Sequence, residues 1–159
     1  MEEIISLRAH HLLCTVLYVG HGYSSEFEMN TSETVKKLRE GCSIVISKSP
    51  DVICADCPNK LDDGGCRLDK RCTNKRQTDK KQEIASIDEL ILEKFNIDTD
   101  RSYVSGELFS RVRDKITPYD FAEWCNECRW HKAGLCTYEK YIERIDGFCH
   151  EESIQKKNI

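Results

Sequence analysis

Cysteine is the residue type that best equips this chain for chemistry, and six of its ten cysteines form two similar groups of three. The repeated groups are Cys54-x2-Cys57 with Gly64-Gly65-Cys66, and Cys125-x2-Cys128 with Gly134-Leu135-Cys136. Cysteines separated by two residues can turn both sulfurs toward one centre, and a glycine can take a positive φ that folds the chain back to deliver a third thiolate. The repetition therefore predicts bound metal or an iron–sulfur cluster. We name Cys54, Cys57 and Cys66 the first clasp, and Cys125, Cys128 and Cys136 the second clasp.

A fourth ligand is expected from the segment Arg8-x-His10-His11-x-x-Cys14. Tetrahedral zinc and a cubane cluster usually take four protein ligands, one more than each clasp supplies. His10 and His11 lie four and three residues before Cys14, so either histidine can share a helix face with it. The plainer interpretation is a buried cysteine beside two hydrogen-bonded histidines. Other residues compete for the fourth position, namely Cys72, Cys149 and His131, whereas Cys42 is expected to be structural.

Spacing alone leaves iron–sulfur and zinc both open. Cys57 is followed by Pro58, which has no N–H to donate to a sulfur, and Cys128 is followed by Arg129, whereas zinc ribbons often place glycine there. Proline beside a ligating cysteine is familiar in cluster proteins. Aromatic residues near the second clasp can shield a cluster from water or simply fill a core; they are Trp124, Trp130 and Tyr138. The cofactor favoured is a 4Fe-4S cluster, one or two per chain, with zinc as the alternative.

Composition excludes several classes of protein. Hydrophobic residues make up 39% of the 159-residue chain and charged residues 33%, as in globular domains, and the net charge of −4 argues against a general nucleic-acid binder. Ten cysteines in 159 residues are about 6% of the chain, below the roughly 8–10% expected of a disulfide scaffold. The acidic N-terminus does not resemble a signal peptide, and the apolar run at 12–19 is too short to span a bilayer. A cytoplasmic location with reduced cysteines is therefore expected.

Periodicity predicts a mainly α fold with one or two short strands, clamped by two cysteine-rich loop sites. Helices are expected at 7–19, from Ser24 or Ser25 to Gly41, from a capping box of Ser86 and Glu89 onward, and over 108–116. Ser43–Ser47 reads as a strand. Thr117-Pro118 with Asp120 predicts the start of a helix that ends by presenting Cys125, and Thr137 predicts the start of another that Gly147 closes.

The chain is expected to form one domain over residues 1–150, followed by a flexible tail at 151–159. An N-terminal helical part (1–68) carries the first clasp, and a C-terminal helical part (83–150) carries the second. Between them, the connector at 67–82 is basic: residues 67–81 hold seven basic and two acidic residues. Such a run is usually a solvated surface, and the alternative is a docking site for an acidic or redox partner. No aromatic residues interleave to stack on single-stranded nucleic acid.

Several motifs together resemble a small bacterial and archaeal family, domain of unknown function 1284. They are Leu7-Arg8-Ala9-His10-His11-Leu12-Leu13-Cys14, Gly20-His21-Gly22-Tyr23-Ser24, Asp51 to Asn59 with Gly64-Gly65-Cys66, and Cys125 to Trp130 with Gly134-Leu135-Cys136. The resemblance covers roughly residues 5–145. It implies an iron–sulfur-binding protein whose ligand set is Cys14 and the two clasps, and it places Cys42, Cys72 and Cys149 outside that set.

Three classes of function are compatible with this pattern. The favoured one is an iron–sulfur protein for electron transfer or redox sensing. The alternatives are a binding module whose clasps hold structural zinc, and an iron–sulfur enzyme with an open iron site. A thiol–disulfide enzyme lacks the β-α-β context it needs. The sequence contains no phosphate loop, nucleophile elbow or paired acid/base signature that would indicate another catalytic activity.

Overall fold

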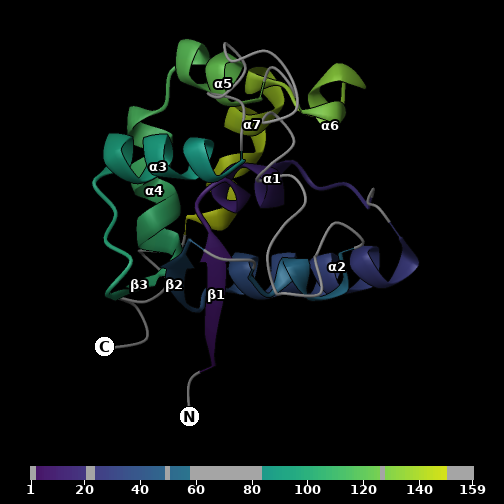
Figure 1. Ribbon diagram of the computed structural model, residues 1–159, viewed down its shortest axis with the longest axis vertical. Coiled ribbons are helices and arrows are strands. Elements are labelled where there is room, and N and C mark those ends of the chain that lie inside the picture. Colours follow the sequence, from purple (N-terminus) through teal and green to yellow (C-terminus); the bar gives the residue numbers. More distant parts are fainter. Residues whose placement is uncertain (1–2, 21–23, 49–50, 58–83, 126–127, 150–159) are drawn as a thin grey trace.

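Helices gathered around a small sheet make up the described part of the chain. The computed structural model describes residues 3–20, 24–48, 51–57, 84–125 and 128–149 (Figure 1). In chain order these form β1 (Ile4–Arg8), α1 (His11–Leu17), α2 (Ser25–Glu40), β2 (Ser43–Ser47), the 3₁₀ turn η1 (Ile53–Asp56), α3 (Ile84–Phe95), β3 (Ser102–Val104), α4 (Ser105–Lys115), α5 (Pro118–Cys125), α6 (Arg129–Lys132), α7 (Tyr138–Ile145) and the 3₁₀ turn η4 (Asp146–Phe148). The predicted class, mainly α with short strands, is confirmed.

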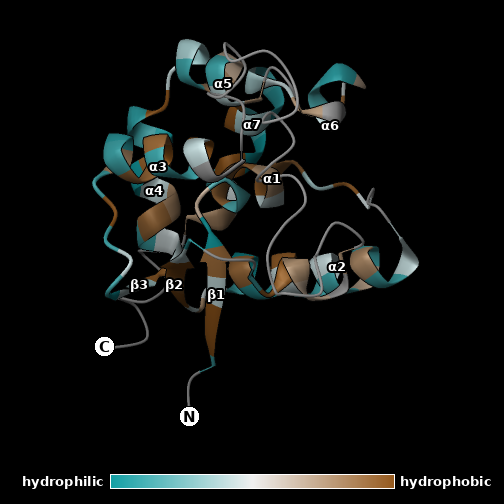
Figure 2. Cartoon of the chain, viewed as in Figure 1, coloured by the Kyte–Doolittle hydropathy of each residue, from teal (hydrophilic) through white to brown (hydrophobic). Residues whose placement is uncertain are grey.

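The sheet has the order β1-β2-β3, with β1 parallel to β2 and β3 antiparallel to β2. Ile5 pairs with Ile44 and Leu7 with Ile46, and all four side chains are buried. Burial at every second residue is the pattern of a strand with one face on the core. Both strands are largely hydrophobic along their length (Figure 2). Parallel strands need a crossover connection, and between β1 and β2 this connection contains the helices α1 and α2.

The helix predicted over 7–19 is wrong in its first part. Leu7 and Arg8 belong to β1, where Arg8 is in register with Ser47, and α1 begins only at His11. The spacing from Leu7 to His11 therefore imitated a helical face, while pairing with β2 decided the local structure. Cys14 does lie on α1, in the same helix as His11.

The remaining elements follow the sequence closely, with one further correction. Ser24 caps α2, its hydroxyl accepting a 3.2 Å hydrogen bond from the Phe27 N–H, and Gly41 ends the helix at φ 90°. The strand at Ser43–Ser47 is confirmed. The capping box at Ser86 is wrong, because α3 already includes Ile84 and Ala85 and so Ser86 lies inside the helix.

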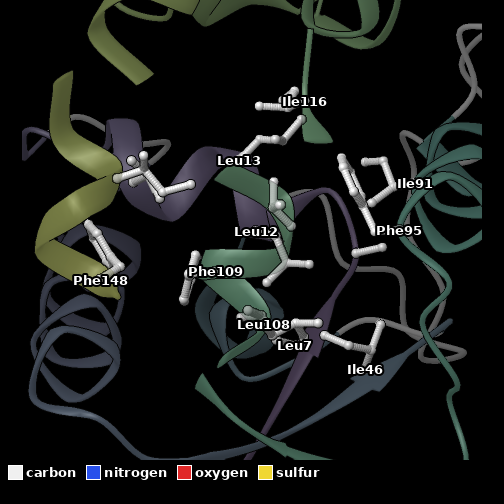
Figure 3. Close-up of a cluster of buried hydrophobic side chains, with 14 of the residues drawn as sticks. Leu7, Leu12, Leu13, Ile46, Ile91, Phe95, Leu108, Phe109, Ile116 and Phe148 are labelled. Carbon is white, nitrogen blue, oxygen red and sulfur yellow. The ribbon is translucent and has the colours of Figure 1, made fainter. Parts of the chain in front are cut away.

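The core is continuous from the sheet to the C-terminal helices. Figure 3 shows Leu12 of α1 close to Leu108 and Phe109 of α4, with Leu7 of β1 nearby. These four side chains are completely buried. Full burial of large apolar side chains is worth roughly 1.5–3 kcal/mol each. The short helix α1 is therefore held by packing and not by its own propensity, since seven residues are too few for a stable isolated helix.

Two hydrogen bonds tie α1 to α7. The Tyr141 hydroxyl donates to the Leu12 carbonyl at 3.0 Å, and Arg144 Nη1 donates to the Leu17 carbonyl at 3.2 Å. Tyr141 is completely buried, so without the Leu12 carbonyl its hydroxyl would be a buried polar group with no hydrogen-bond partner, which is destabilising. In Figure 1, α1 lies between β1 and α7. This arrangement fixes α1 beside the part of the chain that carries the second clasp.

We expect Thr117→Ala to lower the free energy of unfolding by about 1 kcal/mol, because Thr117 and Asp120 form a reciprocal cap on α5. The Thr117 hydroxyl accepts from the Asp120 N–H, and the Asp120 carboxylate accepts from the Thr117 N–H, both at 3.1 Å. Urea unfolding measures the change. The exposed Lys36→Ala is the control and should stay within about 0.5 kcal/mol of wild type. Equal stability of both variants would contradict this role.

Candidate metal centre

The second clasp is built by two helix ends and the turn between them. Cys125 is the last residue of α5, and its carbonyl accepts from the Cys128 N–H at 3.0 Å. Gly134 has φ 81°, which favours glycine and lets the chain reverse toward Cys136. His131 Nδ1 forms a 2.7 Å hydrogen bond with the Cys136 carbonyl and so fixes the end of the loop that carries Cys136. The positive φ predicted for the glycine of this clasp is therefore confirmed.

Cys14 of α1 joins the second clasp in space, although more than 100 residues separate them. Burial raises the pKa of the Cys14 thiol well above its ordinary value, and the next causes are repulsion from the thiolate forms of Cys128, Cys136 and Cys125. All three thiols therefore lie close enough to interact with Cys14. We call these four side chains the four-thiol group. The packing of α1 on α7 is what brings Cys14 to it.

The four-thiol group is largely shielded from solvent. Cys125 and Cys136 are buried, and Cys14 and Cys128 are half-buried. Burial is the largest cause raising the pKa of Cys125, and it also raises that of Cys136, to about 12. The thiols of Cys14, Cys125 and Cys136 are therefore protonated at neutral pH unless a cation lies among them. A metal cation that displaces these protons offsets the negative charge of the resulting thiolates, so the group fits a cationic cofactor.

The spacing of the four sulfurs is wider than that of a compact ion site. Among the residues that the structure describes, one group of three or more candidate ligand atoms lies entirely within 4.8 Å, and it is His11, Asp51 and Cys54. No three of the four thiols are therefore that close together. Four thiolates at about 2.3 Å from one zinc ion would stand roughly 3.8 Å apart.

Two of the predicted aromatic residues, Trp124 and Tyr138, pack against other aromatic rings, and Tyr141 was not among those predicted. Trp124 packs edge-on against Phe95, with ring centroids 5.8 Å apart, so it fills the core. Tyr138 contacts Phe121 at 6.2 Å between centroids and is half-buried. Tyr141 is completely buried, and burial, followed by the charges of Cys125, Cys149 and Cys14, raises the pKa of its hydroxyl. Tyr141 is therefore the aromatic side chain that lies near Cys125 and Cys14, whereas Trp124 and Tyr138 pack against other rings.

The first clasp is described only at its first two cysteines, because Cys66 lies outside the described residues. Cys54 is buried and Cys57 half-buried, on and just after the turn η1. The Cys57 N–H donates to the Cys54 carbonyl at 3.0 Å, and the Cys54 N–H to the Asp51 carbonyl at 3.0 Å. Burial, followed by the Asp51 charge, raises the pKa of Cys54 well above its ordinary value.

Asp51 organises the first clasp. Its Oδ1 accepts from the Ile53 N–H at 2.9 Å and from the Cys54 N–H at 3.2 Å, and so shapes the turn η1. Its Oδ2 is bonded by the Arg8 N–H and, at 2.6 Å, by His11 Nδ1. Burial alone would raise the pKa of Asp51, but His11 and the hydrogen bonds lower it, so the group is an ionised acceptor. His11 Nδ1 must then carry the proton, which leaves Nε2 as the nitrogen able to bind a metal.

His10 forms a second histidine–carboxylate pair next to the first. His10 Nδ1 lies 2.7 Å from Asp88 Oδ1, and the His10 and His11 rings are 4.1 Å apart between centroids. Asp88 Oδ2 accepts from Nε and Nη2 of Arg8, both at 2.7 Å, and Arg8 is completely buried. Burial lowers the pKa of His10, and the adjacent His11 charge lowers it further, so His10 is neutral at pH 7.

Three members of this network were not predicted from the sequence as site residues, namely Arg8, Asp51 and Asp88. For Asp88 a signal exists in the chain: it stands three, four and seven residues before Ile91, Leu92 and Phe95, and thus on the apolar stripe of its helix. A charged residue at such a position requires a buried partner. The identity of that partner, Arg8, is set by the fold.

The other residues considered as ligands either make different contacts in the structure or lie outside the described residues. Cys149 donates from Sγ to the Ile145 carbonyl at 3.3 Å, and Cys42 packs against the core. His131 is engaged through Nδ1 with the Cys136 carbonyl. Cys72, and the basic segment 67–81 that was considered as a docking site, lie outside the described residues. The domain division and the tail at 151–159 stay predictions.

The family model described as a protein of unknown function (DUF1284) matches residues 22–136. The chain belongs to this family. The DUF1284 match ends at Cys136 and contains both clasps, while Cys14 lies ahead of its first residue. Comparison with curated proteins and with solved structures finds no match. None of the helices described in this DUF1284 protein is long and apolar enough to cross a membrane.

We expect the stabilisation that Asp88 gives this DUF1284 protein to disappear in acid. Burial alone would raise the pKa of Asp88, but His10 and Arg8 lower it below the ordinary 3.8. A lowered folded pKa means that the stabilisation is present above pH 3.8 and is lost as the pH falls below it. Urea unfolding of wild type and Asp88→Asn between about pH 6 and 3 tests this. The difference in unfolding free energy should shrink on acidification, and a constant difference would contradict it.

Proposed function

We propose that the chain binds a 4Fe-4S cluster through Cys14, Cys125, Cys128 and Cys136 and serves in electron transfer or redox sensing. The observation that carries the proposal is the position of Cys14, a fourth thiol delivered by α1 to a clasp that has three. Four thiolates are the usual protein ligands of a cubane. Ligands from two distant parts of the chain also tie the cofactor to the folded state.

The wide spacing of the thiols favours a cluster over a single zinc ion. A cubane presents a different iron to each thiolate, so its ligand sulfurs stand further apart than those around one ion. The four thiols interact electrostatically, yet no three of them lie within 4.8 Å of one another. Closing them onto one zinc ion would require movement of α1 relative to α5 and the loop before α7.

The residues around the four-thiol group support a redox role for a bound cluster. When bound, a cluster supplies one-electron chemistry, and its potential depends on burial, net charge and hydrogen bonds to the sulfurs. Here Cys125 and Cys136 are buried, Tyr141 keeps water from one side, and Lys140 and Arg144 place positive charge near Cys136. Half-buried Cys14 and Cys128 leave an edge nearer to solvent, which an electron-transfer partner requires.

The test is the content of iron, zinc and acid-labile sulfide per chain in anaerobically purified protein, with an absorption spectrum of the same sample. Iron and sulfide near four each per chain, with a broad visible absorption that bleaches on reduction, are expected for one cubane. Zinc without sulfide at the four-thiol group would contradict the proposal. It would instead favour a zinc-stabilised binding module, in which a chelator unfolds the chain.

A further inference from the structure

We infer that His11, Asp51 and Cys54 bind a single divalent ion of the zinc class, at a site separate from the four-thiol group. We call these three side chains the compact site. It goes beyond the proposed cluster and does not depend on it. His11 begins α1, and Asp51 and Cys54 belong to the segment that forms η1. The donor atoms are one imidazole nitrogen, one carboxylate oxygen and one sulfur.

The three side chains are gathered as a single ion requires. One candidate ligand atom from each lies within 4.8 Å of the other two, and no other group of three or more among the described residues meets this criterion. Cys57 is described but does not belong to the group. The ligand atoms around one zinc ion stand roughly 3–4 Å apart, so small side-chain shifts close the compact site onto an ion.

Burial holds the compact site in place. The Asp51 side chain has no exposed surface, the His11 side chain is 12% exposed, and Cys54 is buried. Side chains that are already ordered lose little conformational entropy when they bind an ion. His11 gives the site its edge nearest to solvent.

Asp51 becomes a ligand when the proton of the His11 ring changes nitrogen. Without an ion, the carboxylate accepts three backbone hydrogen bonds and a fourth from His11 Nδ1, at 2.6 Å, which fills its roughly four lone-pair positions. An ion between Nδ1 and Oδ2 takes the place of the shared proton, which moves to Nε2 at the other edge of the ring. Either nitrogen of a neutral imidazole can bind a metal. The three backbone bonds to Asp51 are kept.

Charge balance favours a divalent ion. Binding releases the Cys54 proton to solvent and leaves the imidazole neutral, so the ligands carry two negative charges, one on the carboxylate and one on the thiolate. Arg8 is already paired with Asp88, at 2.7 Å. An ion of charge +2 therefore makes this buried site neutral.

The donor atoms identify the class of ion. Magnesium and calcium take oxygen ligands, whereas a set of nitrogen, oxygen and sulfur suits zinc. Three protein ligands leave one tetrahedral position for water, as in open zinc sites.

Two distinct sets of neighbours separate the compact site from the four-thiol group. The main charges that shift the pKa of Cys54 are those of Asp51 and Arg8, and no thiol is among them. The main charges that shift the pKa of Cys14 are those of three thiolates and of Asp88. An ion at the compact site and a cluster at the four-thiol group can therefore be bound independently.

The test uses the full chain with its cluster loaded, equilibrated anaerobically with buffered zinc. Zinc per chain is measured by mass spectrometry and its ligands by X-ray absorption at the zinc edge, which does not detect iron. We expect about one zinc per chain, with one sulfur at roughly 2.3 Å and nitrogen and oxygen at roughly 2.0–2.2 Å. No bound zinc, or a shell with two or more sulfurs, would overturn the inference in wild-type protein, without any variant.

Three variants test the ligands one at a time. His11→Ala, Asp51→Asn and Cys54→Ser should each weaken zinc binding more than about a hundredfold, measured by competition with a chelator. Removing a group that only orients a ligand typically weakens binding about 10–100-fold. A loss of less than about a hundredfold in Asp51→Asn would therefore make Asp51 an orienting group and overturn its assignment as a ligand.

Two matched controls remove neighbouring residues of the same types. His10→Ala removes the other histidine that is paired with a carboxylate, and Cys57→Ser removes the other described thiol of the first clasp. Both should bind zinc like wild type. Loss of zinc in Cys57→Ser would show that the first clasp holds the ion, which overturns the inference.

Iron content distinguishes this inference from the proposed function. Four irons with one zinc in a one-sulfur shell supports both. Eight irons per chain would mean that the first clasp holds a second cluster, which overturns the compact site and leaves the cluster proposal intact. In a chain without sulfide, a zinc ion that is lost in Cys54→Ser and kept in Cys57→Ser would support the compact site and overturn the cluster proposal.

Discussion

Cys14→Ser should abolish the cluster, reducing iron and acid-labile sulfide per chain to less than a tenth of the wild-type content. The second clasp supplies three thiolates, and Cys14 completes them from another part of the chain. A serine hydroxyl is a poor substitute, since clusters are held by thiolates. Because the four sulfurs belong to α1, α5, the residue before α6 and the loop before α7, loss of one also weakens the link between these elements.

Matched cysteine variants make this result specific. Cys42→Ser and Cys149→Ser remove described thiols that lie outside the four-thiol group, and both should keep wild-type iron and sulfide. Cys125→Ser should match Cys14→Ser. A Cys14→Ser protein with full iron and sulfide and an unchanged spectrum would show that another residue is the fourth ligand.

Asp88→Ala should lower the free energy of unfolding by roughly 3–5 kcal/mol, the cost of removing one member of a buried ion pair. Arg8 is completely buried, and Asp88 Oδ2 lies 2.7 Å from both its Nε and its Nη2. The substitution also removes the acceptor for the His10 N–H at 2.9 Å. Because domains are stable by only about 5–15 kcal/mol, the melting temperature should fall on the order of 10 °C.

The neighbouring residue supplies the control. Glu89 pairs with Lys48 at 3.1 Å, but both side chains are more than half exposed, so Glu89→Ala should cost less than about 1 kcal/mol. Urea unfolding under anaerobic conditions gives both values. Combining Asp88→Leu with Arg8→Met removes both charges and should recover part of the lost stability, since buried pairs can often be replaced by apolar residues. Equal effects of Asp88→Ala and Glu89→Ala would mean that Arg8 finds another partner.

Local signals account for the parts of the fold that were predicted well. Thr117 and Asp120 cap α5, Ser24 begins α2, and Gly134 turns the second clasp through a positive φ. Each depends on atoms a few residues apart, so the chain specifies them before any distant contact forms. The strand β1 was not predicted, because its apolar spacing suits a helix as well as a strand. Pairing with β2 decides between the two.

The sequence by itself determined that this chain carries two clasps, that glycine turns the second of them, and that a short segment with two histidines and Cys14 lies apart from both. Only the tertiary structure decided which clasp Cys14 joins and which clasp His11 joins. Packing of α1 on α7 brings Cys14 to the second clasp, and the carboxylate of Asp51 ties His11 to the first. No spacing rule can assign these partners, because they are separated by about 40 to 120 residues and meet only when the core between them is formed.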